Sequence, residues 1–575
     1  RANYSWAHYN QQNLNRSVDV LYSRNPGETI TMDNGRTRGN YLSEIQNNQI
    51  RQTFNLYGTY DNTFANAHSV KVIVGGNYDY KYFKKLGMKR NGLLSESLDD
   101  FNLAKGDDIS ITGGQEEYAI LGFFYRLNYG YKDRYLFEAS GRYDGSSRFA
   151  PGNRWRMFPG VSASWRISQE NFLKNSKVFN ELKLRASYGQ TGNQEGIRLY
   201  DYIQLLKFRD DGWGTKLIYP FGNGSQSQAM GLDVLAGVDR TWEILENVNV
   251  GVDAAFLDSR LGFSFDYFVK MNNNMLIPVT YPSMLGAEAP YSNSGKLRTN
   301  GFELTLNWTD KIGNVEYSAQ FQLTDAVNKL VEYGGADTYK LGLNETREGY
   351  PMNSYFAYVY DGVIKDQADL DAYKKLEGVP SNIGIGDAKF KDLNGDGKIS
   401  TYGDKDGDAE YVGSTTPRYS FGLNLGAKWN NFDISVFFQG VAKRTLFREG
   451  EFSMPWSDWW RYPPQFYYGQ TWNEDRPDAY YPRLTHGEIR HWNYQASTLQ
   501  KINAAYIRLK NIQIGYTLPK GALQKLGIER TRFYVSGQDL FEIHNVKGGW
   551  DPESDKAGFN YPFQRYYSFG IDLTF

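Results

Sequence analysis

The sequence lacks several features that define common classes of protein. None of its 575 residues is cysteine, so disulfides, thiolate zinc sites and cysteine nucleophiles are excluded. The longest uninterrupted apolar run, Tyr118–Tyr125, has about eight residues, far short of the ~20 that a membrane-spanning helix needs. Basic and acidic residues are balanced at 64 and 65, so the positive excess of a nucleic-acid-binding protein is missing. We therefore expect neither a helical membrane bundle nor a nucleic-acid partner.

Catalytic patterns are also missing from the sequence. The glycine-rich segments do not have the spacing of a phosphate-binding loop, and the serine and histidine residues suggest no triad. We therefore expect no enzyme activity.

Aromatic residues and glycine are abundant instead. Tryptophan, tyrosine and phenylalanine number 13, 45 and 34, which together make 16% of the chain, and 59 residues are glycine. Disordered chains are poor in aromatic residues because they cannot bury enough apolar surface to fold. The composition therefore indicates a folded protein.

The strongest local pattern is an alternation of apolar residues with polar or small ones. At the C-terminus, every second residue from Tyr567 to Phe575 is apolar, and the residues between are serine, glycine, aspartate and threonine. Successive side chains of a strand leave on opposite faces, so the pattern predicts strands with one apolar and one polar face. Typical strands have ~5–6 residues, whereas many of these segments are two or three times as long.

About sixteen segments carry this pattern, and the connections between them alternate in length. Tight turns are expected at Lys132-Asp133, Asp258-Ser259 and Asn430-Asn431, while the longest connections are 333–415 and 447–502. All long connections then lie at one end of the sheet, as in outer-membrane barrels with short periplasmic turns and long extracellular loops. The predicted strands are 1–9, 40–60, 68–88, 116–132, 134–149, 154–169, 181–192, 241–257, 260–277, 294–309, 314–332, 416–430, 432–446, 503–518, 530–543 and 564–575.

The two faces of these segments predict a membrane protein. An apolar, aromatic face suits lipid, and a face of Gly, Ser, Asn, Asp and Lys suits a water-filled lumen. Because lipid offers no hydrogen-bond partners, a sheet can span a membrane only if it closes. We therefore predict an all-β protein, a transmembrane antiparallel β-barrel with long extracellular loops. A large secreted β-protein is the alternative, but it would not explain the strand length and the one-sided loops together.

Several segments resemble, in order along the chain, SusC/RagA-type TonB-dependent transporters. Phe575, at the end of an aromatic alternating strand, also resembles the C-terminal signature of bacterial outer-membrane barrels. Each match is weak alone, and their order makes the resemblance specific. The segments are Arg142–Phe149 (RYDGSSRF), Asn153–Trp155, Leu182–Asn193 (LKLRASYGQTGN), Trp242-Glu243, Asn300–Leu304, Asp387–Ile399, Tyr506–Asn511 (YIRLKN), Val535–Phe541 and Asp551–Glu553.

The resemblance implies a 22-stranded barrel filled by an N-terminal plug, with a TonB box ahead of the plug. Sixteen strands are six short of that number. Residues 1–575 are therefore expected to be the C-terminal portion of such a barrel, without the plug domain and the first strands.

The resemblance also implies a function and a location. It implies TonB-dependent import of a large nutrient across the outer membrane of a Gram-negative bacterium, with an oligosaccharide favoured over a peptide as cargo. The implied partners are TonB, a SusD-like surface lipoprotein and outer-membrane lipid, in a dimer of transporter–lipoprotein pairs. A passive sixteen-stranded porin and a surface-binding or adhesion barrel are the alternatives.

One segment, Asp392–Ile399, has the spacing of a calcium-binding loop. It matches positions 1, 3, 5, 6, 7 and 8 of an EF-hand-type loop, with glycine at position 6 for the sharp turn. Position 12 is Gly403 rather than glutamate, so a later aspartate would have to supply the distal carboxylate. Ca²⁺ is the one cofactor that we predict, and an acidic turn without metal is the alternative. The predicted ligands are Asp392, Asn394, Asp396, the carbonyl of Lys398, and Asp404 or Asp406.

The connection 447–502 is rich in aromatic and charged residues. Planar rings stack on sugar faces or pack against peptides, and nearby charges orient polar groups. We therefore predict a cargo-binding surface here; a loop that folds around its own small core or against a lipoprotein is the alternative. The candidate contacts are Trp456, Asp458, Trp459, Trp460, Arg461, Tyr462 and Trp492.

Overall fold

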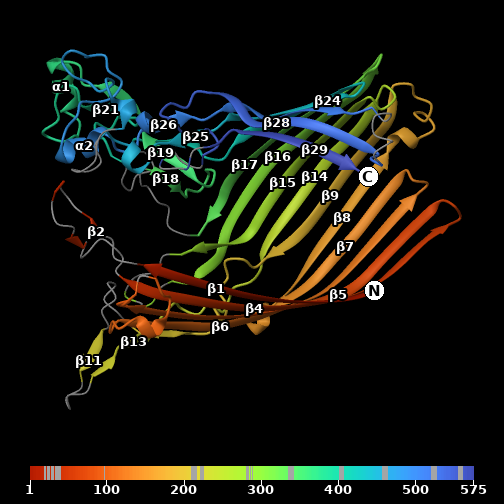
Figure 1. Ribbon diagram of the computed structural model, residues 1–575, viewed down its shortest axis with the longest axis horizontal. Helices are drawn as coiled ribbons and strands as arrows, with labels where there is room; N and C mark the ends of the chain where they lie inside the picture. The colour runs from red at the N-terminus through yellow and green to blue at the C-terminus, as the bar shows by residue number, and fades with distance from the viewer. Residues whose placement is uncertain are drawn as a thin grey trace.

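A sixteen-stranded antiparallel sheet dominates the computed structural model (Figure 1). Each strand pairs with the next strand of the sheet along the chain, so the sheet order is the chain order. The strands are β1 (Ala2–Ser17), β4 (Tyr41–Phe64), β5 (His68–Asn91), β6 (Ile109–Tyr131), β7 (Tyr135–Ser146), β8 (Trp155–Arg166), β9 (Phe179–Asn193), β14 (Glu243–Phe256), β15 (Leu261–Pro278), β16 (Tyr291–Ile312), β17 (Val315–Tyr333), β23 (Arg418–Trp429), β24 (Phe432–Lys443), β27 (Tyr506–Thr517), β28 (Arg530–His544) and β29 (Tyr566–Thr574).

The structure describes most of the chain. The described residues are 1–17, 21–22, 26–27, 31–32, 40–95, 97–208, 217–220, 226–279, 284, 287, 289–334, 342–400, 407–455, 464–519, 527–554, 558, 561 and 563–575. None of the described helices is both long and apolar enough to cross a membrane.

All sixteen predicted strands are present, and their bounds agree to within a few residues except in β1 and β6. The strand β6 begins at Ile109, seven residues before its predicted start at 116. The first strand was expected to end near residue 9, but β1 continues to Ser17 in unbroken register with β4. Gln11–Arg16 are nearly all polar, so no alternation marks them as strand. The backbone pairing with β4 extends the strand where the sequence pattern gives no sign of it.

The tight turns lie at one end of the sheet, as predicted. At the turn between β6 and β7, Lys132 and Asp133 have φ of 49° and 59°. Two consecutive positive φ values are typical of the type I′ turn, whose twist matches that of the strands it joins. Asn430, between β23 and β24, also has a positive φ of 52°. The long connections all lie at the opposite end.

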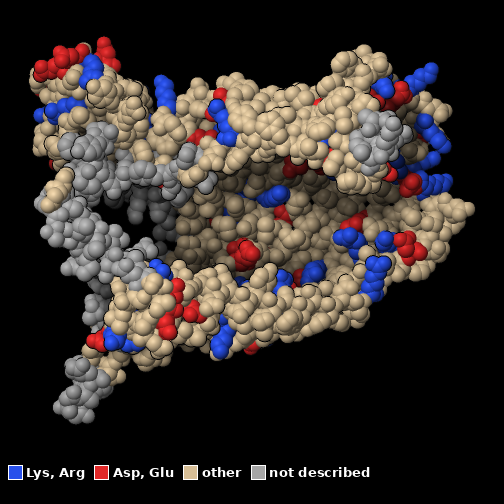
Figure 2. Space-filling view, viewed as in Figure 1, with Lys and Arg blue, Asp and Glu red and all other residues tan. Residues whose placement is uncertain are grey.

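The sheet curves into a trough whose two edge strands are not joined. In Figure 1, β1 and β29 lie on opposite walls, and no pairing between them occurs among the described residues. Figure 2 shows the deep hollow between the walls, with charged side chains along it. The described sheet is therefore open, unlike that of a complete sixteen-stranded porin.

The two faces of the sheet differ as the alternation predicts. On β6, the side chains of Leu121, Phe123 and Tyr125 are exposed on the outer face, and Arg126 and Asn128 face the hollow. The aromatic outer face suits lipid and the polar inner face suits a lumen. The largest buried side chains lie instead among the long connections and strand ends, apart from the middle of the sheet.

The long connections after β17 and β24 fold together into a lobe, at the upper left of Figure 1. Short helices and strands occur in both connections. They are β18 (Gly342–Glu345), β19 (Ser354–Tyr358), β20 (Tyr360–Val363), α1 (Gln367–Tyr373), β21 (Ala388–Phe390), β22 (Ala409–Ser414), β25 (Thr445–Phe447), α2 (Gly487–Asn493) and β26 (Lys501–Asn503). The short pairs β2 (Leu21–Tyr22) with β3 (Thr31–Met32), β10 (Leu206–Phe208) with β13 (Met230–Leu232), and β11 (Ile218–Pro220) with β12 (Gln226–Gln228) belong to other connections.

Candidate functional site at the mouth of the barrel

The lobe is held together by contacts between its two long connections. Asp387, whose side chain is completely buried, accepts two hydrogen bonds from the Arg483 guanidinium at 2.7 and 2.8 Å. It also accepts one from the Asn493 side-chain amide at 2.9 Å, and the Oδ1 atom of the same Asn493 side chain accepts one from the Ala388 backbone N–H at 2.8 Å. A buried carboxylate is stable only if its oxygens are paired and hydrogen-bonded, so this junction fixes the two connections to each other.

Trp492 takes part in the same junction. Its indole N–H donates to the Ala388 carbonyl at 3.0 Å, and its ring packs edge-on to Phe390 with 5.4 Å between centroids. The ring is half-buried in the core that α2 forms with β21. The other six predicted cargo contacts, Trp456, Asp458, Trp459, Trp460, Arg461 and Tyr462, lie outside the described residues.

A second part of the connection 447–502 forms an aromatic core. Tyr467, Tyr481 and Tyr494 pack around Leu499, and burial raises the pKa of the Tyr467 and Tyr494 hydroxyls. The Arg448 side chain donates to the Tyr481 hydroxyl at 2.8 Å and to the Leu499 carbonyl. In this described part of the connection, the rings stabilise the lobe, which is the alternative that the sequence left open.

The structure describes residues 392–400 of the segment that resembles an EF-hand-type loop, and hydrogen bonds from its own backbone hold its side chains. The Asp392 carboxylate accepts hydrogen bonds from the backbone N–H of Gly395 at 2.7 Å and of Gly397 at 2.9 Å. Asn394 and Asp396 each accept one from the backbone two residues on, at 3.1 and 2.8 Å. Both glycines have positive φ, 73° and 81°, which lets the loop turn sharply around these oxygens.

Asp408 closes this loop, a role that the spacing rule did not predict. Its buried carboxylate accepts from the backbone N–H of Leu393 at 2.7 Å and of Ser400 at 2.9 Å. The predicted distal ligands Asp404 and Asp406 lie outside the described residues. Among the described residues, no group of three or more His, Cys, Asp or Glu side chains is placed to hold a metal. The side-chain oxygens of Asp392, Asn394 and Asp396 accept hydrogen bonds from the backbone of the loop itself.

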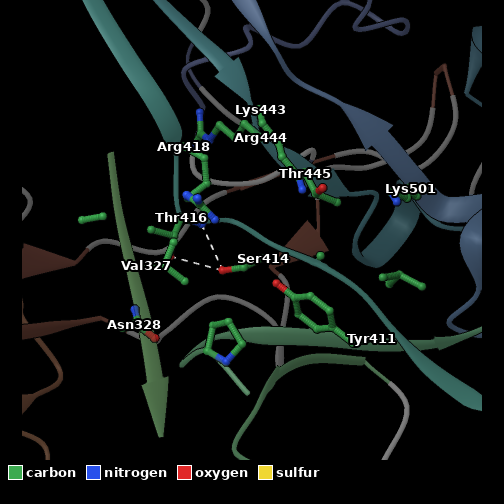
Figure 3. A pocket seen from close by; sticks show the side chains of 14 residues that line it. Val327, Asn328, Tyr411, Ser414, Thr416, Arg418, Lys443, Arg444, Thr445 and Lys501 are labelled. Atoms are coloured by element: carbon green, nitrogen blue, oxygen red, sulfur yellow. Dashed lines mark hydrogen bonds between the residues drawn. The ribbon is translucent and has the colours of Figure 1, made fainter. Parts of the chain in front are cut away.

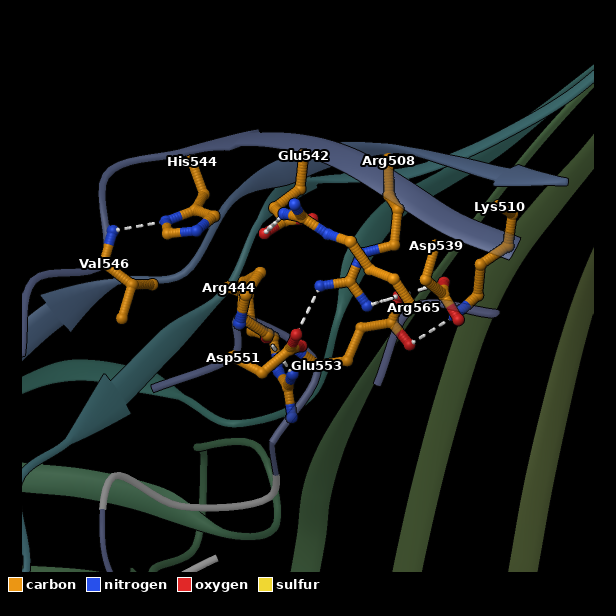
Figure 4. Close-up of polar contacts among 11 residues, drawn as sticks. Arg444, Arg508, Lys510, Asp539, Glu542, His544, Val546, Asp551, Glu553 and Arg565 are labelled. Atoms are coloured by element: carbon orange, nitrogen blue, oxygen red, sulfur yellow. Dashed lines mark hydrogen bonds and ion pairs between the residues drawn. The ribbon is translucent and has the colours of Figure 1, made fainter. Parts of the chain in front are cut away.

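An ionic cluster joins the end of the barrel wall to the connection between β28 and β29 (Figure 4). Arg508 of β27 is only 1% exposed, and it donates to Asp551 at 2.5 Å and to Glu553 at 3.0 Å. Lys510 contacts Glu553 at 3.1 Å and Asp539 at 2.9 Å. Three of the segments that carry the family resemblance, 506–511, 535–541 and 551–553, therefore meet in one cluster.

The residue next to this cluster ties it to the lobe. Trp550 packs with Leu446, Ile502 and Ala504 in an apolar core, edge-on to Phe452. In addition, the Arg444 guanidinium donates to the Pro552 carbonyl at 2.5 Å. The segment 550–553 therefore connects the lobe to the barrel wall.

A second group of resembling segments meets on the other wall. Trp242 donates to the Arg154 carbonyl at 2.8 Å and packs against Phe149 and Phe158. The buried carboxylate of the neighbouring Glu243 accepts from Asn193 at 2.9 Å and from the Leu276 backbone at 2.7 Å. The spacing of these motifs along the chain could not show that they lie together.

The inner wall nearby is hollowed. A depression of about 1,070 Å³ extends across β6 to β9 and reaches β14 and β15. Its lining combines small residues such as Gly160, Ser162 and Gly189 with the charged side chains of Glu138 and Lys270. A wide hollow of this kind, with apolar as well as polar lining residues, can accommodate a hydrated solute or a folded segment.

A long-stranded antiparallel sheet with an aromatic outer face, a polar inner face and a folded lobe at one end defines an outer-membrane barrel protein. Comparison with known proteins agrees. The family model described as "TonB dependent receptor-like, beta-barrel" matches residues 1–540. The chain therefore belongs to this family, whose members are transport receptors of the outer membrane of Gram-negative bacteria.

Individual relatives support the SusC/RagA type. The chain is 28% identical to TonB-dependent receptor P26 of Formosa agariphila, over 93% of this chain and 55% of that protein. It is 25% identical to TonB-dependent receptor SusC of Bacteroides thetaiotaomicron, over 98% of this chain and 54% of that protein. The structure of the RagAB peptide transporter has the same fold, with a TM-score of 0.80 at 23% identity over all of this chain and 60% of that one. The chain thus spans about half the length of the curated relatives it matches.

Proposed function

We propose that this chain forms most of the wall and the extracellular mouth of a transporter that imports a large nutrient in a TonB-dependent manner. The observation that supports this most strongly is the lobe: two long connections build a cored structure over one end of a polar trough. A passive pore needs no such structure, whereas a transporter that captures cargo from outside needs a shaped surface at its mouth.

The open edges of the sheet support the rest of the proposal. Unpaired strand edges cannot be exposed to lipid, because each unsatisfied backbone group there costs several kcal/mol. We therefore propose that about six further strands join β1 to β29, giving the 22-stranded wall of plugged transporters. A plug in the lumen, with a TonB box ahead of it, would then supply the part on which TonB pulls.

The partner at the mouth would be a SusD-like surface lipoprotein, and the cargo an oligosaccharide or a peptide. The lobe offers the lipoprotein a preformed surface, because residues of this chain already pack its apolar cores. The aromatic segment 456–462 remains the candidate cargo contact. Trp492 would act on cargo indirectly, by fixing α2 on β21. RagAB, which has this fold, is described as a peptide transporter, so a peptide cargo is the second candidate.

Calcium would have a structural role in this scheme. An ion held by Asp392, Asn394, Asp396 and a distal aspartate would cross-link the connection 342–414 and shape the docking surface. Extracellular calcium modules bind at ~10⁻⁴–10⁻³ M, an affinity that tolerates an irregular twelfth position.

The experiment is a growth test with the full-length protein and with residues 1–575 alone, in a host that lacks the transporter. The full-length protein should restore TonB-dependent growth on the cognate nutrient, and residues 1–575 should not. The lipoprotein should co-purify with the full-length protein from native membranes. TonB-dependent growth supported by residues 1–575 alone would contradict the proposal, as would a full-length protein that conducts solutes without TonB.

A further inference from the structure

A small cavity lies where the lobe meets the barrel wall (Figure 3). It measures about 230 Å³, and the ends of β17, β23 and β24 form one side while β22 and β25 form the other. Four of its fourteen lining residues are basic, and none is aspartate or glutamate. Four more carry hydroxyl groups. The lining therefore offers many hydrogen-bond donors and no carboxylate.

The basic residues of this cavity are only partly compensated. Arg418 is paired with the buried Asp325, which lies behind the lining, at 2.5 and 2.6 Å. Among the residues that the structure describes, the Arg444 side chain donates hydrogen bonds to the backbone carbonyls of Thr415 and Pro552. Among the described residues, the side chains of Lys443 and Lys501, which are both exposed, make no hydrogen bond or ion pair. Two lysine side chains that line this cavity are therefore without a carboxylate partner in the part of the chain that the structure describes.

The Arg508 cluster shows that this chain can compensate its basic side chains. There, Arg508 and Lys510 lie within 4 Å of the carboxylates of Asp539, Asp551 and Glu553. The cavity at the lobe has no such carboxylates among its lining residues. Its lining residue Arg444 nevertheless donates to the carbonyl of Pro552, which lies between Asp551 and Glu553 of the cluster. Like charges brought together raise the free energy of the folded state unless an opposite charge lies between them.

The hydroxyl groups favour an anion that carries oxygen atoms. The Ser414 hydroxyl donates to the Thr416 hydroxyl at 3.2 Å and accepts from the Thr416 backbone. The hydrogen of the Thr416 hydroxyl is left over and can donate into the cavity. Ammonium groups and hydroxyl donors together are the groups that bind sulfate, phosphate and carboxylate oxygens.

We propose that this cavity is a binding site for an oxyanion, in which Lys443 and Lys501 supply the charge and Thr416 supplies a hydroxyl donor. The ligand is a sulfate, a phosphate ester or a carboxylate, carried either by a soluble molecule or by a lipid headgroup of the outer leaflet. The volume accommodates one such group with a few waters. The site is independent of TonB, so it goes beyond the transport function proposed above.

The test is direct binding by the full-length protein in zwitterionic detergent, titrated separately with inorganic sulfate, inorganic phosphate and acetate at low ionic strength. The double variant Lys443→Gln/Lys501→Gln should bind roughly a hundredfold more weakly, because each of the two lost charge-assisted contacts accounts for about a factor of ten. Lys443→Arg/Lys501→Arg should keep the binding. Lys177→Gln, an exposed lysine in the turn after β8, is the matched control and should behave as wild type.

Two outcomes support the site and identify the source of the anion. In nanodiscs, equal sulfate binding with phosphatidylcholine and with phosphatidylglycerol would indicate a soluble oxyanion. Sulfate binding that phosphatidylglycerol abolishes in the wild type would indicate a lipid phosphate in the same cavity. The proposal would be overturned if sulfate, phosphate and acetate bound equally to the wild type and to the glutamine double variant. Circular dichroism should show that both proteins are folded.

Discussion

Gly251 lies directly between Arg185 and Asp266 on three neighbouring strands, and its missing side chain lets the guanidinium of Arg185 reach Asp266. A Cβ atom at Gly251 would lie 2.4 Å from the Asp266 carboxylate and 3.0 Å from the guanidinium carbon. Arg185 donates four hydrogen bonds of 2.7 to 3.0 Å, two to Asp253 and two to Asp266. One arginine thereby fixes the register of β9, β14 and β15 on the inner wall.

The same arrangement occurs twice more on the inner wall. In each case an arginine passes over a glycine of the next strand and reaches an acceptor directly opposite that glycine. These glycines allow a side chain to cross a strand, which explains their place in long membrane strands where glycine is otherwise unfavourable. The two sets are Arg532, Gly515 and Asp433, and Arg142, Gly122 and Asn77.

Replacing Gly251 with alanine should therefore displace the Arg185 guanidinium. We expect the free energy of unfolding to fall by about 1–3 kcal/mol, the usual cost of overpacking a filled site. Urea unfolding of the full-length protein in detergent measures it. Gly262→Ala is the control, because a Cβ there meets nothing closer than 3.5 Å. Equal stability of Gly251→Ala and Gly262→Ala would show that the passage of the Arg185 side chain over Gly251 does not contribute to the free energy of unfolding.

Replacing Arg508 with methionine should loosen the segment 550–553. The change leaves the carboxylates of Asp551 and Glu553 without their buried partner, and breaking such a pair costs about 3–5 kcal/mol. Hydrogen exchange should then rise in residues 545–554 while the middle of the barrel stays protected. Arg565→Met removes an exposed pair with Glu542 and should have little effect. Unchanged exchange in Arg508→Met would show that the cluster does not hold this segment.

The lobe should lose stability in acid through Asp369 on α1. Burial raises the pKa of this carboxyl, but hydrogen bonds from Lys389 and from the Lys365 backbone lower it more, so the net pKa lies below the ordinary value. A carboxyl with a lowered pKa stabilises the fold above its unfolded pKa of ~3.9, and that contribution disappears as pH falls through the folded pKa. The hydrogen-exchange protection of α1, taken relative to the intrinsic exchange rate at each pH, should therefore fall below about pH 4. Asp369→Asn should make α1 exchange faster at neutral pH and remove the acid dependence; a variant that keeps it would point to another group.

Calcium should protect the loop 392–400 from proteolysis. Adding ~1 mM Ca²⁺ to the metal-free full-length protein should slow cleavage there, and a chelator should reverse the effect. Asp392→Asn combined with Asp396→Asn should abolish this protection and leave the barrel folded. Asp371→Asn is the control, since that carboxylate contacts only Gln367 on the same helix. Cleavage that does not respond to Ca²⁺ in the wild type would mean that the loop is an acidic turn.

The strands of the barrel wall can be predicted from the amino-acid sequence. Alternation fixes which side chains face lipid and which face the lumen, because strand geometry has a period of two residues. Turn pairs such as Lys132-Asp133 mark the end of the sheet where the connections are short. The long connections then fall at the opposite end, because successive antiparallel strands run in opposite directions. These are local rules, so a local pattern is enough to apply them. The polar half of β1 departs from the prediction because pairing with β4 extends a strand that carries no pattern of its own there.

The contacts between residues that are far apart along the chain follow only from the tertiary structure. Asp387 and Arg483 are 96 residues apart, and Arg508 and Asp551 are 43 apart; no periodicity relates such positions. The motif segments could be recognised in order, but only folding brings 506–511, 535–541 and 551–553 into one ionic cluster. The same holds for Lys443 and Lys501, which line one cavity because the long connection after β24 returns to the end of that strand. Contacts between distant parts of a chain depend on how loops pack, and loop packing depends on the whole fold.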